Sequence, residues 1–286
     1  MKTFVKKMIP NRVKAFRLEI ILKYKQRTGA NRVFPDFIII GAQKSGTTSL
    51  YSYLSQHPQL VPSINKEVHF FDGGLNPNVD TFDKGEAWYR AHFPLNRNMS
   101  NNKKAFESSP LYIFNPFAPQ RISKLIPEVK LIAILRNPVE RTISHYFHEK
   151  RNDRESLPIM EALQSEEERM RPVFNEQDYK NNIFIHHSYK NRGLYHKQIK
   201  RYLNYFPMSN ILVINSETLF TQPHDTLRRV YQFVGVDSEF IINNLTPRNV
   251  GSNRNAIDPN VYEYLEEYFR SHNQELYKLI GENYGW

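Results

Sequence analysis

The chain has 286 residues, a net charge of +10 and no cysteine. The lack of cysteine excludes disulfide frameworks, thiolate catalysis and zinc or iron–sulfur sites with cysteine ligands. Hydrophobic residues make up 40% of the chain, enough for the core of one large α/β domain, and no apolar run approaches the roughly 20 residues of a membrane-spanning helix.

Positive charge is concentrated at the N-terminus. Residues 1–32 contain ten lysines and arginines and one acid, Glu19, so they carry +9 of the total charge of +10. We expect a basic helical arm over residues 1–32, followed by a single domain over residues 33–286. The arm is interpreted as a solvated helix that caps the domain, with contact to anionic lipid or to an anionic substrate as the alternatives. Because no signal peptide is recognisable, we expect a cytoplasmic protein, at most peripheral to a membrane.

Strands and helices alternate along the rest of the chain. Runs rich in β-branched residues and leucine predict buried parallel strands at 34–40, 130–135 and 210–215, with a shorter strand at 104–107. Helical patterns are predicted at 47–56, 116–125, 139–151, 195–205 and 224–234, and an exposed helix at 161–170. Asp258 and Pro259 suit the start of a C-terminal helix. The alternation predicts an α/β fold, a P-loop-like single domain with a central parallel β-sheet flanked by helices. Residues 152–190 are charged and lack a strand pattern, so we expect an insertion that forms a flap near the substrate site.

The most informative segment joins the first predicted strand to the first predicted helix. Backbone N–H groups and the helix dipole at such a junction form an anion site. In the phosphate loop of nucleotide triphosphatases a lysine follows the second glycine, whereas here Lys44 precedes Gly46 by two positions. No predicted strand ends in an aspartate suited to magnesium. The loop therefore predicts metal-free binding of one phosphate-like group by Lys44, Ser45, Gly46, Thr47, Thr48 and Ser49.

Two motifs in this segment and beyond it resemble those of a known family. The run Gln43-Lys44-Ser45-Gly46-Thr47-Thr48 resembles the 5′-phosphosulfate loop of sulfotransferases, which use 3′-phosphoadenosine 5′-phosphosulfate (PAPS). The run Lys66-Glu67-Val68-His69-Phe70-Phe71 resembles the branch that includes heparan sulfate sulfotransferases. The resemblance implies Glu67 as the catalytic base, with Lys44 stabilising the charge on the transferred group.

A second match concerns the nucleotide's 3′-phosphate. Arg136 ends a predicted strand, at the edge where α/β proteins bind ligands, and Ser144 follows about two helical turns later. The resemblance places both residues on the 3′-phosphate, which suits the bidentate hydrogen bonding of arginine. It also places Tyr195, which follows Arg192-Gly193-Leu194, and Arg254 near the nucleotide. Around Arg254 the relatives have a lysine between two cysteines, and this chain lacks all three.

The acceptor side is less well specified. The run Glu107-Ser108-Ser109-Pro110-Leu111-Tyr112 resembles a family segment that lines the acceptor site, so Ser109 is a candidate acceptor residue, together with Glu67, His69 and Lys104. Apolar neighbours are expected to raise the pKa of Glu67. Two alternatives remain: Glu67 is a surface residue paired with Lys66, or His69 is the base.

The leading hypothesis is a PAPS-dependent sulfotransferase that produces 3′-phosphoadenosine 5′-phosphate (PAP). It would transfer a sulfuryl group in line, without a metal, to a hydroxyl or amine of a carbohydrate or of a lipid-linked glycan, and we expect no nucleic-acid partner. A P-loop nucleotide kinase or triphosphatase is the first alternative, and the displaced Lys44 argues against it. A non-catalytic nucleotide-binding module is the second, and the combination of Lys44, Glu67 and Arg136 argues against that.

Overall fold

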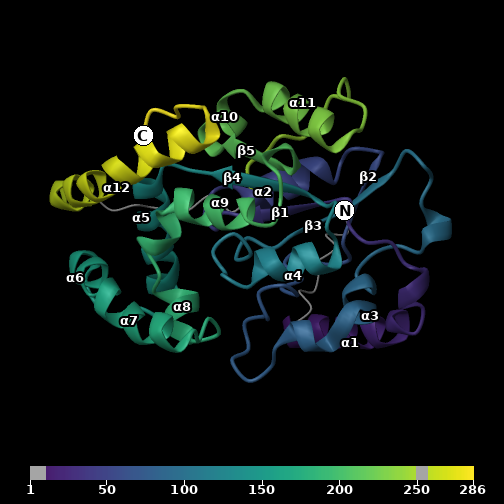
Figure 1. Cartoon of the computed structure of the whole chain (residues 1–286), viewed down its shortest axis with the longest axis horizontal. Coiled ribbons are helices and arrows are strands. Elements are labelled where there is room, and N and C mark those ends of the chain that lie inside the picture. The colour runs from purple at the N-terminus through teal and green to yellow at the C-terminus, as the bar shows by residue number, and fades with distance from the viewer. Residues whose placement is uncertain (1–10, 249–256) are drawn as a thin grey trace, which may run out of the picture.

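A computed structural model describes residues 11–248 and 257–286. At its centre is a parallel five-stranded sheet with strand order β2-β3-β1-β4-β5 (Figure 1). The strands are β1 Phe37–Gly41, β2 Leu60–Pro62, β3 Lys104–Ser108, β4 Lys130–Leu135 and β5 Ile211–Asn215. The expected α/β fold with a central parallel sheet is confirmed. The three-residue β2 was missed, because so short a segment has no detectable period.

Helices cover both faces of this sheet (Figure 1). They are α1 Asn11–Gln26, α2 Thr47–Leu54, α3 Gly85–Arg90, α4 Ala118–Leu125, α5 Pro138–Arg151, α6 Ile159–Gln164, α7 Glu166–Glu176, α8 Asn182–His186, α9 Tyr195–Leu203, α10 Ser216–Thr221, α11 Pro223–Val234 and α12 Pro259–Ile280. Short 3-10 turns lie at Gly29–Asn31, Thr81–Lys84, Asn96–Asn98, Asn191–Gly193 and Met208–Asn210. As expected, Asp258 caps α12 by accepting a hydrogen bond from the Asn260 N–H at 2.9 Å.

The strands are apolar along their whole length because both faces of the sheet are buried. Ile38 and Ile40 of β1 contribute to a core with α4 and α9, whereas Phe37 and Ile39 contribute to a second core with α2 and α11. Successive side chains of any strand point to opposite faces of the sheet. Because both faces are buried here, both sets of side chains are apolar, and the strand is a continuous apolar run in the sequence. β1 lies between β3 and β4, so the strand order reverses there, which is where open α/β sheets bind ligands.

The segment between α5 and α9 packs more tightly than its sequence predicts. The expected exposed helix at 161–170 is divided between α6 and α7, and both contribute buried side chains, among them Leu163 and Met170. Glu166 is fully buried and accepts hydrogen bonds from the backbone N–H groups of Lys190 at 2.6 Å and Asn191 at 2.9 Å. The expectation of an exposed helix was wrong, because apolar partners that are distant in sequence bury it: Leu163 packs with α5 and α12, and Met170 packs into the core that includes Phe184 of α8.

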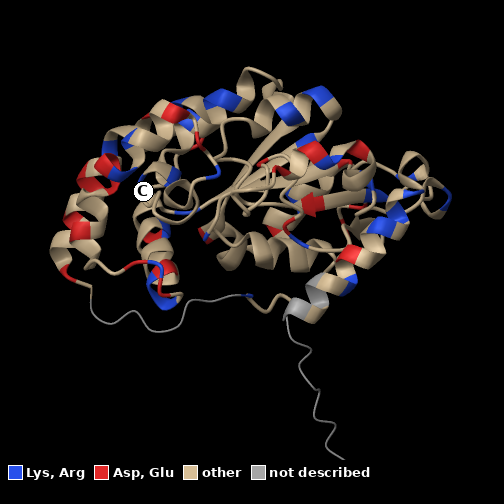
Figure 2. Cartoon of the chain, turned by 90° about the horizontal axis from the view of Figure 1, so that it is seen from below, with Lys and Arg blue, Asp and Glu red and all other residues tan. Residues whose placement is uncertain are grey.

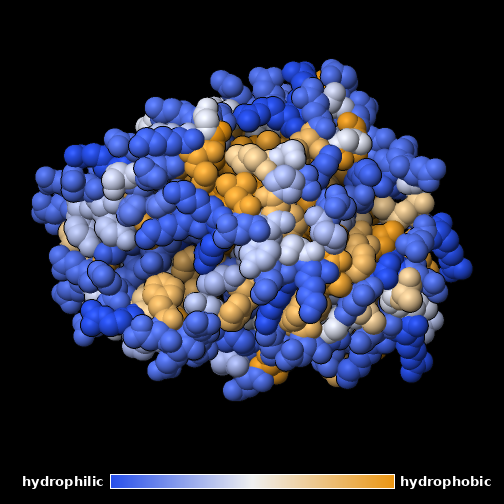
Figure 3. Space-filling view, in the orientation of Figure 1, coloured by the Kyte–Doolittle hydropathy of each residue, from blue (hydrophilic) through white to orange (hydrophobic). Residues whose placement is uncertain are grey.

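Within the basic arm, Asn11–Gln26 form α1, which packs against α3. Leu22 is buried, whereas Phe16, Ile20 and Tyr24 recur every four residues on an exposed face. Charged residues elsewhere lie mainly on the outer helices (Figure 2), and one face of the molecule is largely hydrophilic with apolar patches between (Figure 3). Within residues 11–248 and 257–286, we find no helix with the length and apolar content needed to cross a bilayer.

Candidate active site

The Lys44 loop turns from the end of β1 into the start of α2. Gly46 precedes α2 with φ +96°, and Lys44 has φ +68°, so both lie in the left-handed region. Gly46 suits this position because it has no Cβ: one placed there would lie 3.1 Å from Cζ of Phe220. The loop therefore presents its backbone and the N-terminus of α2 to the space beyond the sheet edge.

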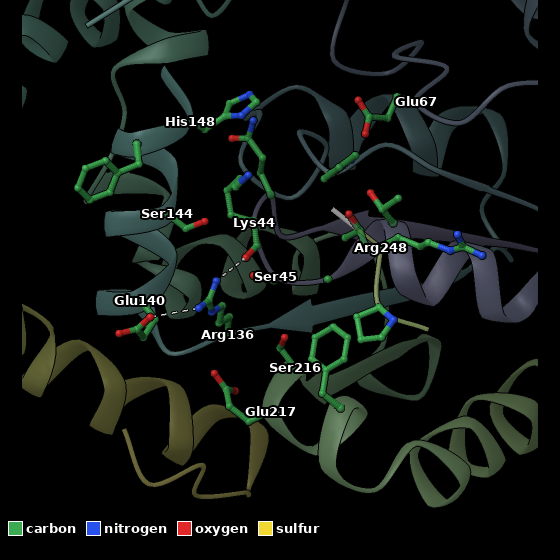
Figure 4. A pocket seen from close by; sticks show the side chains of 18 of the residues that line it. Lys44, Ser45, Glu67, Arg136, Glu140, Ser144, His148, Ser216, Glu217 and Arg248 are labelled. Carbon is green, nitrogen blue, oxygen red and sulfur yellow. Dashed lines mark hydrogen bonds and ion pairs between the residues drawn. The ribbon is translucent and has the colours of Figure 1, made fainter. Parts of the chain in front are cut away.

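That space is a cavity of about 960 Å³ at the carboxyl ends of β1 and β4 (Figure 4). It brings together eight of the residues predicted from the sequence: Lys44, Ser45, Gly46, Thr47, Thr48, Glu67, Arg136 and Ser144. The predicted 5′-phosphosulfate loop and the predicted 3′-phosphate residues, represented by Lys44 and Arg136, which are 92 residues apart, thus face one cavity.

Arg136 connects the two halves of the cavity. Its Nη1 donates to the Lys44 carbonyl at 3.4 Å, and its Nη2 lies 3.1 Å from Oε2 of Glu140 (Figure 4). Ser144 lies one turn after Glu140 on α5, whose N-cap Asn137 and Pro138 start the helix directly after Arg136. Local spacing accounts for the positions of Glu140 and Ser144 relative to Arg136, whereas the contact with Lys44 joins segments that are 92 residues apart.

The cavity is electropositive. Burial lowers the pKa of Lys44, and the positive charges of Arg151 and Arg136 lower it further. Arg248 also lines the cavity, and its backbone N–H donates to Oγ of Ser49 at 2.9 Å. Several cations around one space favour an anionic ligand.

The lining residues that the sequence interpretation missed include three basic side chains, those of His148, Arg151 and Arg248. The first two lie four and seven residues after Ser144, so a helical projection of 139–151 would have shown them on the same face. Arg248 carries no local signal, because a contact with Ser49, 199 residues away, places it there.

Glu67 lies at the edge of the cavity in a strained segment. Its φ is +64° and that of His69 is +54°, and the Glu67 N–H donates to the Ser108 carbonyl at 2.9 Å. The Glu67 carboxylate pairs with Lys66 and lies 3.7 Å from Nε2 of His69. Glu67 therefore faces the cavity and also forms the pair with Lys66 that the sequence analysis gave as an alternative.

Charge distinguishes the two candidate bases. Burial opposes ionisation of Glu67, but the contacts with His69 and Lys66 outweigh it and lower its pKa to about 2. The expected rise in this pKa was therefore wrong. Burial also opposes a charge on His69, but Asp72, 2.6 Å from Nδ1, and Glu67 together raise its pKa to about 10. An imidazolium has no site for a proton, whereas the Glu67 carboxylate does.

The structure does not place Ser109 where an acceptor could reach it. Ser109 is fully buried: its hydroxyl donates to Glu107 at 2.8 Å and accepts the His69 N–H at 3.2 Å. Glu107 also accepts from Tyr89 at 2.6 Å, and the Tyr112 hydroxyl accepts the Phe70 N–H at 2.9 Å. Burial raises the pKa of Glu107 to about 7, although hydrogen bonds from Tyr89 and Ser109 oppose the rise. These buried groups support the segment that carries Glu67 and His69.

Lys104 is likewise not brought to the cavity. It begins β3, so it lies at the amino edge of the parallel sheet, and its Nζ is 3.1 Å from Oδ1 of Asp36. The cavity is at the opposite, carboxyl edge. Pro110, two residues after the end of β3, does line the cavity.

Tyr195 lies behind the cavity wall rather than in it. It is buried, and its hydroxyl donates to the Arg136 carbonyl at 2.9 Å. Ser49 is also buried beneath the loop, where it contacts Arg248. The remaining predicted nucleotide residue, Arg254, lies outside the described residues.

A smaller cavity of about 180 Å³ adjoins the larger one. The two share Gln43, Glu67, Pro110 and His148. The other walls of the smaller cavity include His69 and three residues from the predicted insertion, Arg154, Ile185 and His186. Among residues 11–248 and 257–286, no group of three or more histidines and carboxylates is placed to hold a metal ion.

Comparisons with known proteins agree with this geometry. The family model described as "Sulfotransferase domain" matches residues 34–273. Mouse heparan sulfate glucosamine 3-O-sulfotransferase 6 is 30% identical over 277 residues, covering 89% of this chain and 74% of that protein. The Dictyostelium discoideum membrane-associated sulfotransferase kil1 is 26% identical over 321 residues, covering 88% and 66%. A crystal structure of a sulfotransferase from Alicyclobacillus acidocaldarius matches with a TM-score of 0.69 and 33% identity, covering 87% of this chain and 97% of the other.

Proposed function

The chain belongs to the sulfotransferase family, and on that premise we propose that it transfers a sulfuryl group from PAPS to a carbohydrate hydroxyl or amine, with Glu67 as the base. The observation that supports this most directly is the convergence of the Lys44 loop, Arg136 and Glu67 on one cavity. Neither the kinase alternative nor the non-catalytic alternative gains support from the site.

The residues of the larger cavity suit the two phosphate ends of PAPS. Lys44, Thr47, Thr48 and the N-terminus of α2 would hold the 5′-phosphosulfate, and Arg136 and Ser144 the 3′-phosphate. The Ser45 hydroxyl supports the fit, because it is fully buried near the Tyr195 phenol yet makes no hydrogen bond of normal geometry with the residues that are described. A phosphate oxygen would supply its partner.

The proposed chemistry needs no metal ion. The acceptor oxygen or nitrogen forms a bond to sulfur while the bond from sulfur to the bridging phosphate oxygen breaks, releasing PAP. Glu67 takes the acceptor proton, and Lys44 stabilises the charge that grows on the leaving oxygen. His69, charged and held by Asp72, stabilises the Glu67 carboxylate and orients it.

The position of the smaller cavity supports a role in acceptor binding, because Glu67 lines both cavities whereas Lys44 and Arg136 line only the larger one. We propose that residues 152–190 help to form this acceptor site through Arg154, Ile185 and His186. A carbohydrate acceptor is proposed because relatives named as heparan sulfate glucosamine 3-O-sulfotransferases are about 30% identical to this chain. A lipid-linked glycan remains an alternative acceptor of the same class.

Transfer of labelled sulfate from PAPS to a panel of glycans tests this proposal. The wild-type protein should label at least one glycan, and Glu67→Gln should bind PAP as tightly as wild type while losing at least a hundredfold in kcat. His69→Gln separates the two bases: a greater loss of kcat there, with activity retained in Glu67→Gln, would move the role of base to His69. Absence of PAP binding to the wild-type protein would exclude PAPS as the donor.

We propose that residues 1–32 form an arm outside the catalytic domain, in line with a family match that begins at residue 34. Contact between the arm and an anionic membrane is a further hypothesis, and so is a cytoplasmic location of the protein. Sedimentation with phosphatidylcholine vesicles, with and without phosphatidylglycerol, decides between membrane contact and a simple cap. Phe16→Ser with Tyr24→Ser, both exposed in α1, should abolish any sedimentation that depends on the arm.

A further inference from the structure

The peptide group between Arg136 and Asn137 is held from both sides by side chains distant in sequence. Its carbonyl oxygen accepts a hydrogen bond from the Tyr195 hydroxyl at 2.9 Å. Its N–H donates to Oε1 of Glu217 at 3.1 Å. Tyr195 is the first residue of α9 and Glu217 is the second residue of α10, so two helices bind one peptide group. We refer to Tyr195 and Glu217 together as the clamp.

The sheet register brings Glu217 to this peptide. Leu135 at the end of β4 pairs with Asn215 at the end of β5, so the residues that follow them leave the sheet side by side. Asn215 then caps α10, its side chain accepting the Glu217 N–H at 2.7 Å. This cap fixes the direction in which the Glu217 side chain leaves the helix.

Gly193 lets Tyr195 approach from the other side. A Cβ at Gly193 would lie 3.1 Å from Cβ of Pro138 and 2.6 Å from a ring carbon of Phe269. The glycine thus allows the chain before α9 to pass close to the start of α5. The Tyr195 ring is then buried near Trp286, with ring centroids 6.1 Å apart.

The clamp acts where the sheet no longer holds the backbone. The ladder between β4 and β5 ends at Leu135, and α5 begins at Pro138, so Arg136 and Asn137 form the connection. A rotation of this peptide would redirect the Arg136 guanidinium, which reaches toward the Lys44 carbonyl and Glu140. We infer that Tyr195 and Glu217 are positioning residues that orient Arg136 toward the donor's 3′-phosphate, an inference that rests on the proposed use of PAPS.

Binding of two nucleotides measures this role directly. PAP carries the 3′-phosphate and adenosine 5′-monophosphate lacks it, so the ratio of their affinities reports on Arg136. Calorimetric titration of Tyr195→Phe should show PAP binding weakened roughly five- to thirtyfold, the range for one lost hydrogen bond to a buried carbonyl, with the monophosphate unchanged within twofold.

Tyr202→Phe is the matched control. Tyr202 lies on the same helix, is fully buried and also donates to a backbone carbonyl, that of Tyr112, at 3.0 Å. Both variants should lose similar thermal stability. Only Tyr195→Phe should change the affinity ratio, because Tyr202 contacts no residue of the Arg136 connection.

Glu217 needs a different comparison, because its side chain also lines the cavity. Glu217→Gln keeps an oxygen that can accept the Asn137 N–H, whereas Glu217→Ala removes it. The alanine variant should lose the preference for PAP and the glutamine variant should retain it. Equal behaviour of the two variants would overturn the role of Glu217.

The outcomes separate the clamp from the proposed function. If wild type prefers PAP and Tyr195→Phe keeps the same affinity ratio, the clamp is overturned and PAPS remains the donor. Weakening of both nucleotides to the same degree would also overturn it, since that indicates general loss of structure. A wild-type protein that binds the two nucleotides equally would overturn the use of PAPS, and the inference built on it.

Discussion

Glu107→Gln is expected to remove a pH dependence of stability. Glu107 is fully buried at the carboxyl end of β3, and burial raises its pKa from 4.5 to about 7. Because this folded-state pKa exceeds the unfolded value, the folded protein binds the proton more tightly than the unfolded chain. The stabilisation is present below pH 4.5 and is lost as the pH rises through about 7.

The size of the effect follows from the two pKa values. One pKa unit corresponds to about 1.4 kcal/mol, so ionising Glu107 in the folded protein costs about 3 kcal/mol of stability between pH 4.5 and pH 8. Glutamine stays neutral over this range and can still accept hydrogen bonds from Tyr89 and Ser109. The free energy of unfolding of Glu107→Gln, relative to wild type, should therefore rise by about 3 kcal/mol from pH 4.5 to pH 8.

Urea unfolding of both proteins at several pH values measures this difference. Glu128→Gln, which changes an exposed carboxylate, is the control and should differ from wild type by a constant amount. A difference between Glu107→Gln and wild type that does not change with pH would refute the reasoning, since it would mean that Glu107 titrates alike in the folded and unfolded states.

Three further predictions concern the site. Lys66→Gln removes a charge that lowers the pKa of Glu67, so the acidic limb of the plot of kcat/KM against pH should move to higher pH. An acidic limb that does not move would count against Glu67 as the base. Gly46→Ala forces a left-handed φ of +96° and a contact with Phe220, so PAP affinity should fall at least tenfold in a titration; unchanged affinity would show that the loop adapts. Lys104→Ala should leave kcat and KM within twofold of wild type, because Lys104 lies at the far edge of the sheet; a large rise in acceptor KM would contradict this placement.

Sequence patterns predicted the parts of the fold that depend on near neighbours. The runs at 130–135 and 139–151 predicted β4 and α5 almost to the residue. A strand with both faces buried is a continuous apolar run, and a proline at the first turn marks the start of a helix, so both patterns are visible in the local sequence. The segment at 161–170 was misjudged, because its buried residues pack against elements that are distant in sequence, among them α5 and α12. The strand β2 was too short to show a period. A segment that is buried by residues distant in sequence shows no such local pattern.

The same distinction applies to the site. The order of residues in the loop from Gly41 to Thr48, and the spacing from Arg136 to Ser144, are local, so the sequence by itself was enough to predict a phosphate site without the triphosphatase lysine. Only the tertiary structure decided that Glu67 is strongly ionised, that Ser109 is buried and that Tyr195 supports Arg136 from behind. Burial and charge depend on groups brought together across tens to hundreds of residues, and no short-range pattern encodes which groups those are.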